Sequence, residues 1–218
     1  MLEDPGSLKA VAVVLILGVV ALGESCASGA SRRLKAPLHG RMLVAVDNLN
    51  KGRIRLDRDG RRLVVDLARE ISGCTGRTYD LTVNEEYESS VDFEIVDETE
   101  KAPYTYLVLL ASASPNCNVQ GQCGGGGSDS TLIWLKTTKE LSLAGKQAFS
   151  IDECRVGRVA NVFKEEDPED YYFETIQAKD LPWIGDVLQV EYQERGEDSL
   201  QRPVYDRRDP DAGLERIP

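Results

Sequence analysis

The stretch 130-STLIWLKTTKELSLAGKQAFSI-151 is the clearest structural signal in the sequence. Its two apolar runs, 130–137 and 141–151, are separated by the polar triplet Thr138, Lys139 and Glu140. Runs of this length on either side of a polar turn are typical of two β-strands joined as a hairpin. The stretch therefore predicts an antiparallel hairpin that turns near residues 138–140, with Trp134 packed in the core.

Short apolar runs separated by turn residues recur along most of the chain. Strands at this spacing predict one mainly β antiparallel domain over residues 41–206, built as a sandwich, a partly closed barrel or a meander. Residues 207–218 are expected to form a polar tail that packs loosely. The other predicted strands are 41–47, 53–57, 79–84, 91–97, 104–111, 157–163, 171–178, 187–194 and 202–206.

One short segment has helical rather than strand periodicity. Apolar residues recur at three- and four-residue intervals between Gly60 and Gly73, which predicts one short helix near residues 61–72. The preceding Asp57-Arg58-Asp59-Gly60 begins like a calcium loop, but the further oxygen ligands of such a loop are missing after it. It is better interpreted as a turn in which Asp59 caps the helix.

The first 40 residues carry the signs of export. An uncharged run of 14 residues from Ala10 to Gly23 is followed by small residues, which predicts a signal peptide over residues 1–27, cleaved after Ala27. Residues 28–40 are then expected to be a flexible basic linker. Two alternatives remain open: a lipoprotein anchored through Cys26, and an uncleaved membrane anchor. The anchor reading arises because the basic residues follow the apolar run instead of preceding it.

The cysteine content agrees with an oxidising compartment. Removal of Cys26 with the leader leaves an even number of cysteines, enough for two disulfides. The register of the 130–151 hairpin, extended backwards, brings Cys123 opposite Cys154, and Cys74 is then left to pair with Cys117. No cysteines have the C-x2-C spacing of a structural zinc site, so no metal is predicted.

The charge balance limits the classes of partner. The formal net charge is −11 and the isoelectric point is near 4.7, so the chain is expected to repel nucleic acids and anionic lipids. An unidentified protein or envelope component, with a basic surface as one option, is the expected partner. The membrane is expected to be involved only through the N-terminal segment. The acidity itself is interpreted first as a solvated surface, and attraction to a basic partner or to cations is the alternative.

Candidate binding residues lie in a glycine-rich loop and among exposed aromatic residues. The glycine run lies between two predicted strands and offers several backbone N–H groups to a ligand. A flexible connection between the strands would have the same composition. An aromatic residue in a loop and two tyrosines beside an acidic run suit protein or sugar recognition. The predicted ligand-binding residues are Gly124, Gly125, Gly126, Gly127, Tyr171, Tyr172 and Trp183.

The sequence offers little material for catalysis. The only histidine is His39, in the predicted linker, and no cofactor motif is present. Paired carboxylates are the remaining option, with candidates Glu94, Asp97, Glu174 and Glu191. No residue set is assigned as catalytic. The sequence thus predicts an exported, disulfide-stabilised β domain, secreted or periplasmic, that acts as a non-catalytic binding module. A carboxylate-dependent envelope hydrolase, or an inhibitor of a basic secreted enzyme such as lysozyme, is the alternative.

Overall fold

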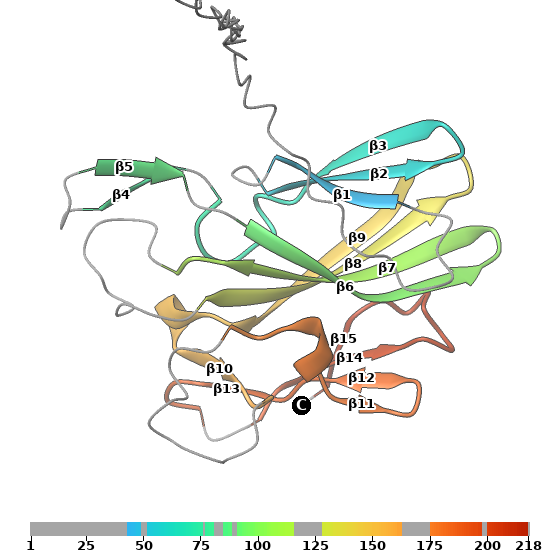
Figure 1. Ribbon diagram of the computed structural model, residues 1–218. Helices are drawn as coiled ribbons and strands as arrows, with labels where there is room; N and C mark the ends of the chain where they lie inside the picture. Colours follow the sequence, from blue (N-terminus) through green and yellow to red (C-terminus); the bar gives the residue numbers. More distant parts are fainter. Residues whose placement is uncertain are drawn as a thin grey trace, which may run out of the picture. The chain divides into compact units, whose positions relative to one another are not determined.

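The chain is mainly β, as the sequence predicts. The computed structural model describes residues 43–48, 52–75, 77–80, 85–88, 91–115, 128–162, 175–197 and 200–217 (Figure 1). Strands make up 60% of the structure and helix 4%, and the described strands form no closed barrel. Every described strand pair is antiparallel. The described ranges contain no helix long and apolar enough to cross a bilayer.

The strands that the structure describes form five sheets. The largest has four strands, β6 (Val91–Lys101), β7 (Tyr104–Ala113), β8 (Asp129–Thr138) and β9 (Leu143–Asp152), which pair in the order of the sequence. The others are β1 (Leu43–Asn48) with β2 (Arg53–Arg58) and β3 (Arg61–Asp66); β4 (Arg77–Asp80) with β5 (Glu85–Glu88); β10 (Arg158–Ala160) with β13 (Tyr192–Glu194); and β11 (Trp183–Ile184), β12 (Val187–Gln189), β14 (Arg202–Asp206) and β15 (Glu215–Ile217). Among the described residues, single 3₁₀ turns cover Cys154–Val156 and Ala178–Asp180.

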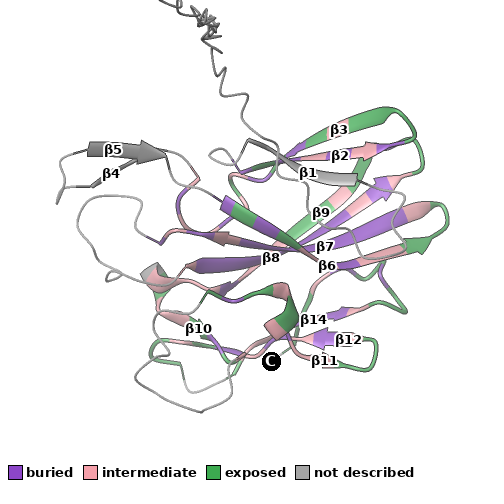
Figure 2. Cartoon of the chain, viewed as in Figure 1, coloured by how far each residue is buried: buried purple, intermediate pink, exposed green. Residues whose placement is uncertain are grey.

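Strand β7 is buried on both faces, which explains its continuous apolar sequence YTYLVLLASA. Most of β7 is coloured as buried in Figure 2. Its alternate residues belong to two separate cores. Leu107 and Leu109 pack with Ile54 and Leu56 of β2 in the first core. The second core contains Tyr106, Val108 and Leu110 of β7, Leu132 and Trp134 of β8, and residues of the C-terminal third, which include Leu188, Val190 and Tyr205. Trp134 is 5% exposed and is a core residue, as the sequence predicts.

The predicted helix near residues 61–72 is wrong, because residues 61–66 form strand β3. Asp59 and Gly60 have φ values of 49° and 76°, the positive angles of a two-residue type I′ turn, and they join β2 directly to β3. Val64 and Val65 favour the extended backbone because they are branched at Cβ. Asp-Gly is thus a hairpin signal here, and Asp59 caps no helix.

The expectation of a loosely packed tail is also wrong. Residues 207–214, called the strap below, contact all four strands of the β6–β9 sheet in turn. This four-stranded sheet is called the central sheet below. The strap contacts Asp97 and Lys101 of β6, Tyr106 of β7, Trp134 and Lys136 of β8, and Gln147 of β9. It then leads into β15, which pairs with β14. Polar composition misled the prediction, because the strap is held through hydrogen bonds and ion pairs more than through apolar burial.

We expect Gly213→Ala to lower the free energy of unfolding by about 2 kcal/mol. Gly213 has a φ of 77°, and an added Cβ would collide with the Gln147 side-chain amide that accepts the Leu214 N–H. Gly60→Ala is the matched control, since Gly60 has nearly the same φ of 76° but open space around its Cα. It should cost only about 1 kcal/mol. Urea denaturation of both variants measures the difference, and equal losses would contradict close packing of the strap.

Candidate functional site

Several of the predicted residues lie outside the described residues. These are His39, Glu174, the two tyrosines Tyr171 and Tyr172, the glycine run Gly124, Gly125, Gly126 and Gly127, and the cysteines Cys26, Cys117 and Cys123. Their proposed roles stay predictions. The candidates that the structure does place are Trp183, Glu94, Asp97 and Glu191.

The cysteine pairing is only partly visible. Cys74 and Cys154 are each bonded in a disulfide, but the described residues show no complete pair. The predicted pairs Cys123–Cys154 and Cys74–Cys117 therefore stay predictions. The register argument behind the first is wrong, because Ser130 pairs with Asp152 and the extended ladder would place Ser128 opposite Cys154. Two bulges between β8 and β9 account for part of the shift.

The candidate carboxylates do not converge into one pair. The Oε2 of Glu94 accepts a hydrogen bond from the Ala178 N–H at 2.9 Å. Glu191 forms an ion pair with Arg202 at 2.9 Å. Both therefore serve local contacts, and Asp97 is the candidate in the most elaborate polar surroundings.

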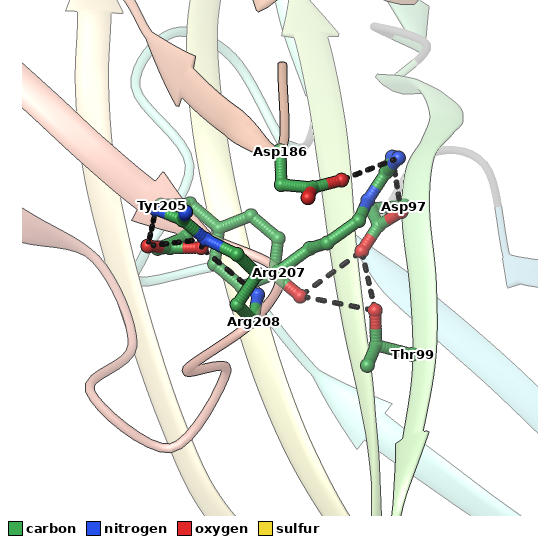
Figure 3. A network of polar contacts seen from close by, with 7 residues as sticks. Asp97, Thr99, Asp186, Tyr205, Arg207 and Arg208 are labelled. Carbon is green, nitrogen blue, oxygen red and sulfur yellow. Dashed lines mark hydrogen bonds and ion pairs between the residues drawn. The ribbon is translucent and has the colours of Figure 1, made fainter. Parts of the chain in front are cut away.

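Asp97 is the centre of a polar network between β6 and the C-terminal sheet (Figure 3). Its side chain is 8% exposed. One carboxylate oxygen accepts from the Tyr205 hydroxyl at 3.0 Å and from the Thr99 hydroxyl at 2.8 Å, and the other accepts from the Arg207 guanidinium at 2.8 Å. Three donors satisfy this buried carboxylate, so it holds its neighbours in place and is poorly suited to act as a free acid or nucleophile.

Tyr205 is the buried part of the network. Burial raises the pKa of its hydroxyl, and the negative charge of Asp97 beside it raises it further. The phenol therefore stays protonated and donates to Asp97 over the whole physiological pH range. Asp206 lies at the exposed end of the network, and hydrogen bonds from Arg208 lower the pKa of its carboxyl to about 2. Its carboxylate therefore stays charged at a lower pH than an ordinary aspartate.

Trp183 is brought next to Asp97 through Arg207. The Arg207 guanidinium lies 4.4 Å from the centre of the Trp183 ring, within the range of a cation–π contact. The ring of Tyr205 meets Trp183 edge to face, with centroids 6.4 Å apart. The sequence singled out Trp183 and Asp97 separately, and the structure shows that they share one arginine.

Trp183 begins the β11–β12 hairpin, whose tip is apolar and exposed. Ile184 is 69% exposed, the highest value among the exposed large hydrophobic residues described. Gly185, with a φ of 63°, and Asp186 form the two-residue turn. Asp186 makes a second ion pair with Arg207 at 3.9 Å (Figure 3). The hairpin thus carries an exposed Ile184 next to Trp183, whose ring is contacted by Arg207 and Tyr205.

Sequence reasoning missed Tyr205, Arg207 and Ile184. The run Pro203-Val204-Tyr205 alternates within a predicted strand, which marks Tyr205 as inward-facing, so its burial was open to prediction. Its partner Asp97 lies 108 residues away, and no local pattern joins the two. Arg207 was assigned to the tail because it follows the last predicted strand.

A second acidic site was also missed, at the end of β8 and β9. Asp129 is 1% exposed, and its Oδ1 accepts the Cys154 N–H at 2.9 Å. Burial, together with the negative charge of Asp129, raises the pKa of Asp152 to about 7. Ser130, directly opposite Asp152 in the ladder, is fully buried, and its hydroxyl has no hydrogen-bond partner among the described residues. Strand β8 begins with Asp129-Ser130, and β9 ends at Asp152 opposite Ser130, so acids at adjoining strand ends were the available signal.

The described side chains contain no group of three or more acids, cysteines or histidines placed to hold a metal ion. The Asp97 network places the Arg207 guanidinium against the Trp183 ring. The comparisons add no relative to this picture: no protein-family model, curated protein or solved structure matches the chain.

Proposed function

We propose that the chain is an exported, disulfide-stabilised β domain that acts as a non-catalytic binding module, with the β11–β12 hairpin as its binding surface. The observation that supports this proposal is the exposed Ile184 beside a Trp183 that Arg207 and Asp97 hold in place.

The physical argument is preorganisation. Binding energy at protein interfaces concentrates in a few Trp, Tyr and Arg residues at well-packed centres. A side chain that is already ordered loses less entropy on binding. Trp183 is fixed by one cation–π contact and one aromatic contact, and Ile184 adds apolar surface next to it. The exposed Ile184 side chain at the hairpin tip suits insertion into an apolar pocket of a partner.

The charge of the surface favours a basic partner. Both ion pairs of the Arg207 guanidinium are made with acids of the chain itself, Asp97 and Asp186. Asp186 at the tip is 49% exposed, and the chain carries a net charge of −11. Complementary charge accelerates association with a basic protein. Inhibition of a basic secreted enzyme such as lysozyme is one form of this function.

Site-specific photo-crosslinking tests the surface. A photoreactive amino acid at position 184, introduced in the cells that produce the chain, should yield an adduct with a basic protein. The matched control is position 64, where Val64 is also apolar and exposed, at 45%, on the β2–β3 hairpin. No adduct at 184, or equal adducts at 184 and 64, would contradict the proposed surface.

We expect Ile184→Asp to weaken binding of the captured protein by about 10-fold to 100-fold. Loss of a central apolar anchor and burial of a new charge act in the same direction. Val64→Asp should leave the affinity unchanged. Surface plasmon resonance with the purified partner measures both variants, with hen egg lysozyme as the first basic probe.

A carboxylate-dependent envelope hydrolase remains the second candidate, and Asp152 is the observation that favours it. A carboxyl group whose pKa is raised toward neutrality is suited to act as a general acid, and the pKa of Asp152 is raised to about 7 by burial and by the negative charge of Asp129. Turnover of peptidoglycan or another envelope polysaccharide, abolished by Asp152→Asn, would support the hydrolase and contradict the binding module.

The proposed compartment is the cell exterior or the periplasm, with a lipid anchor on Cys26 as the alternative. Intact mass of the native protein, with thiols alkylated before and after reduction, tests cleavage, lipidation and disulfides in one measurement.

A further inference from the structure

We infer that the strap, residues 207–214, is an electrostatic latch that controls the order of the proposed binding surface. The inference rests on the proposed function, because it concerns the regulation of the same Trp183 hairpin.

The first step is the position of Arg207. It is the first residue of the strap and also the residue that stacks on Trp183. Asp209, two residues further on, forms an ion pair with Lys101 at 3.1 Å. Asp97 and Lys101 belong to the same strand, β6, so the beginning of the strap is fixed along one edge of the central sheet. Displacement of Asp209 from Lys101 would loosen the backbone that carries Arg207.

The second step is the far end of the strap. Asp211 receives hydrogen bonds from Lys136 Nζ at 2.5 Å and from the Tyr106 hydroxyl at 3.0 Å. These two donors hold the pKa of the Asp211 carboxyl below its usual value. Lys136 is itself placed by the Tyr104 ring, with Nζ 4.0 Å from its centroid. The far end is therefore held by a basic and aromatic cradle of Tyr104, Tyr106 and Lys136.

The third step is that this closure is weak. The Asp209 and Asp211 side chains are 65% and 49% exposed, and exposed ion pairs contribute about 0–1 kcal/mol each and are screened by salt. Apolar burial of the strap is confined to Pro210, whose carbonyl accepts from the Trp134 indole N–H at 3.0 Å, with a smaller contribution from Leu214. A segment with few apolar contacts opens at low free energy.

The fourth step is that the strap touches both tryptophans of the chain. Trp134 bonds to Pro210 in its middle, and Trp183 stacks on Arg207 at its beginning. Each tryptophan therefore reports on a different part of the same segment. A change at Asp211 can reach Trp183 along the strap or through the second core, in which Tyr106 and Tyr205 both pack, and exchange of a strap amide distinguishes the two routes.

The test is ¹⁹F NMR of the full chain labelled with 5-fluorotryptophan, with the two signals assigned by Trp183→Phe. The Asp209→Asn/Asp211→Asn double variant should shift both signals, although neither substituted residue touches Trp183. Raising the NaCl concentration from about 0.02 M to 0.5 M should shift the wild-type signals in the same direction. The same salt change should shift the Trp134 signal of the double variant less, because that variant lacks the two strap ion pairs that salt would screen. The matched control is Asp59→Asn, which removes one exposed charge from the β2–β3 turn and should shift neither signal.

Hydrogen exchange supplies an independent measurement. The Leu214 N–H, which donates to Gln147, should exchange at least about tenfold faster in the double variant than in the Asp59→Asn control. A Trp134 signal that moves while Trp183 stays fixed would overturn the latch, because the two ends would then be independent. Two unmoved signals would overturn it as well.

The outcomes separate the latch from the proposed function, since the NMR and exchange measurements need no partner. If the latch is correct, the double variant should also bind the partner captured at position 184 about fivefold more weakly. Shifted signals with unchanged affinity would overturn the regulatory role. A failure of crosslinking at 184 with shifted signals would count against the binding surface alone.

Discussion

Asp97→Ala is expected to lower the free energy of unfolding by about 3–4 kcal/mol, the largest loss that we predict for a single substitution. The substitution removes the main acceptor of the buried Tyr205 hydroxyl, which keeps only a 3.5 Å contact to the Thr99 hydroxyl. It also removes the closer of the two carboxylates that pair with the Arg207 guanidinium, and leaves Asp186 at 3.9 Å. An unpaired buried donor costs the full desolvation penalty of its group, which is larger than the net contribution of the lost bond. Chemical denaturation measures the effect.

Asp97→Asn is the informative control for this prediction. It keeps an oxygen acceptor at nearly the same volume but removes the charge, so it should cost about half as much. A double-mutant cycle with Arg207→Met isolates the ion pair from the Tyr205 bond. If Asp97→Ala and an exposed substitution such as Glu94→Ala cost the same, the buried network does not stabilise the fold as we describe.

Asp152→Asn is expected to stabilise the protein by about 2 kcal/mol at pH 8, allowing for the solvent that still reaches this half-buried side chain. The folded-state pKa of Asp152 is about 7, above its unfolded value of 3.8. Below pH 4 both states hold the proton, and the group costs nothing. As the pH rises from 4 to 7 the unfolded state loses the proton first, so the wild-type stability falls. Asparagine removes this penalty.

The measurement is the midpoint of urea unfolding of wild type and Asp152→Asn at pH 4 and at pH 8. The two proteins should differ little at pH 4, and the variant should be more stable at pH 8. Asp59→Asn is again the control, because Asp59 lies in an exposed turn. A difference that is independent of pH would contradict the raised pKa.

The strands of the central sheet were predictable because burial on both faces leaves a continuous apolar run. Strands β7 and β8 match the predicted runs 104–111 and 130–137 to within two residues at each end. Strand β14 coincides with the predicted run 202–206. In contrast, β3 has apolar residues at spacings that fit both a helix and a strand, and the Asp59-Gly60 turn decides between them. The Asp59-Gly60 pair predicts a hairpin only when both residues are expected to take positive φ angles.

The candidate site was predictable only in its parts. Trp183 was noted because it stands in a loop-like, proline-containing segment, and Asp97 because it lies on a strand. Their connection through Arg207 depends on a contact between β6 and the strap, which are more than 100 residues apart. Local periodicity carries no information on such contacts. The polarity of the strap hid it further, since segments that are held by charge resemble solvated tails in composition.

The double burial of β7 also sets the order in which the chain can mature. Residues 54–71 cover its first-core face, and they have already left the ribosome when β7 emerges. On the other face, Tyr106, Val108 and Leu110 pack against residues that are synthesised much later, as far along as Tyr205. At ribosomal speeds of about 5–20 residues per second, the roughly 90 residues between β7 and β14 leave that face bare for about 5–20 seconds. A nascent chain that stops before the last strands would expose the apolar second-core face of this sheet. Chaperones and proteases recognise exposed apolar surfaces of this kind.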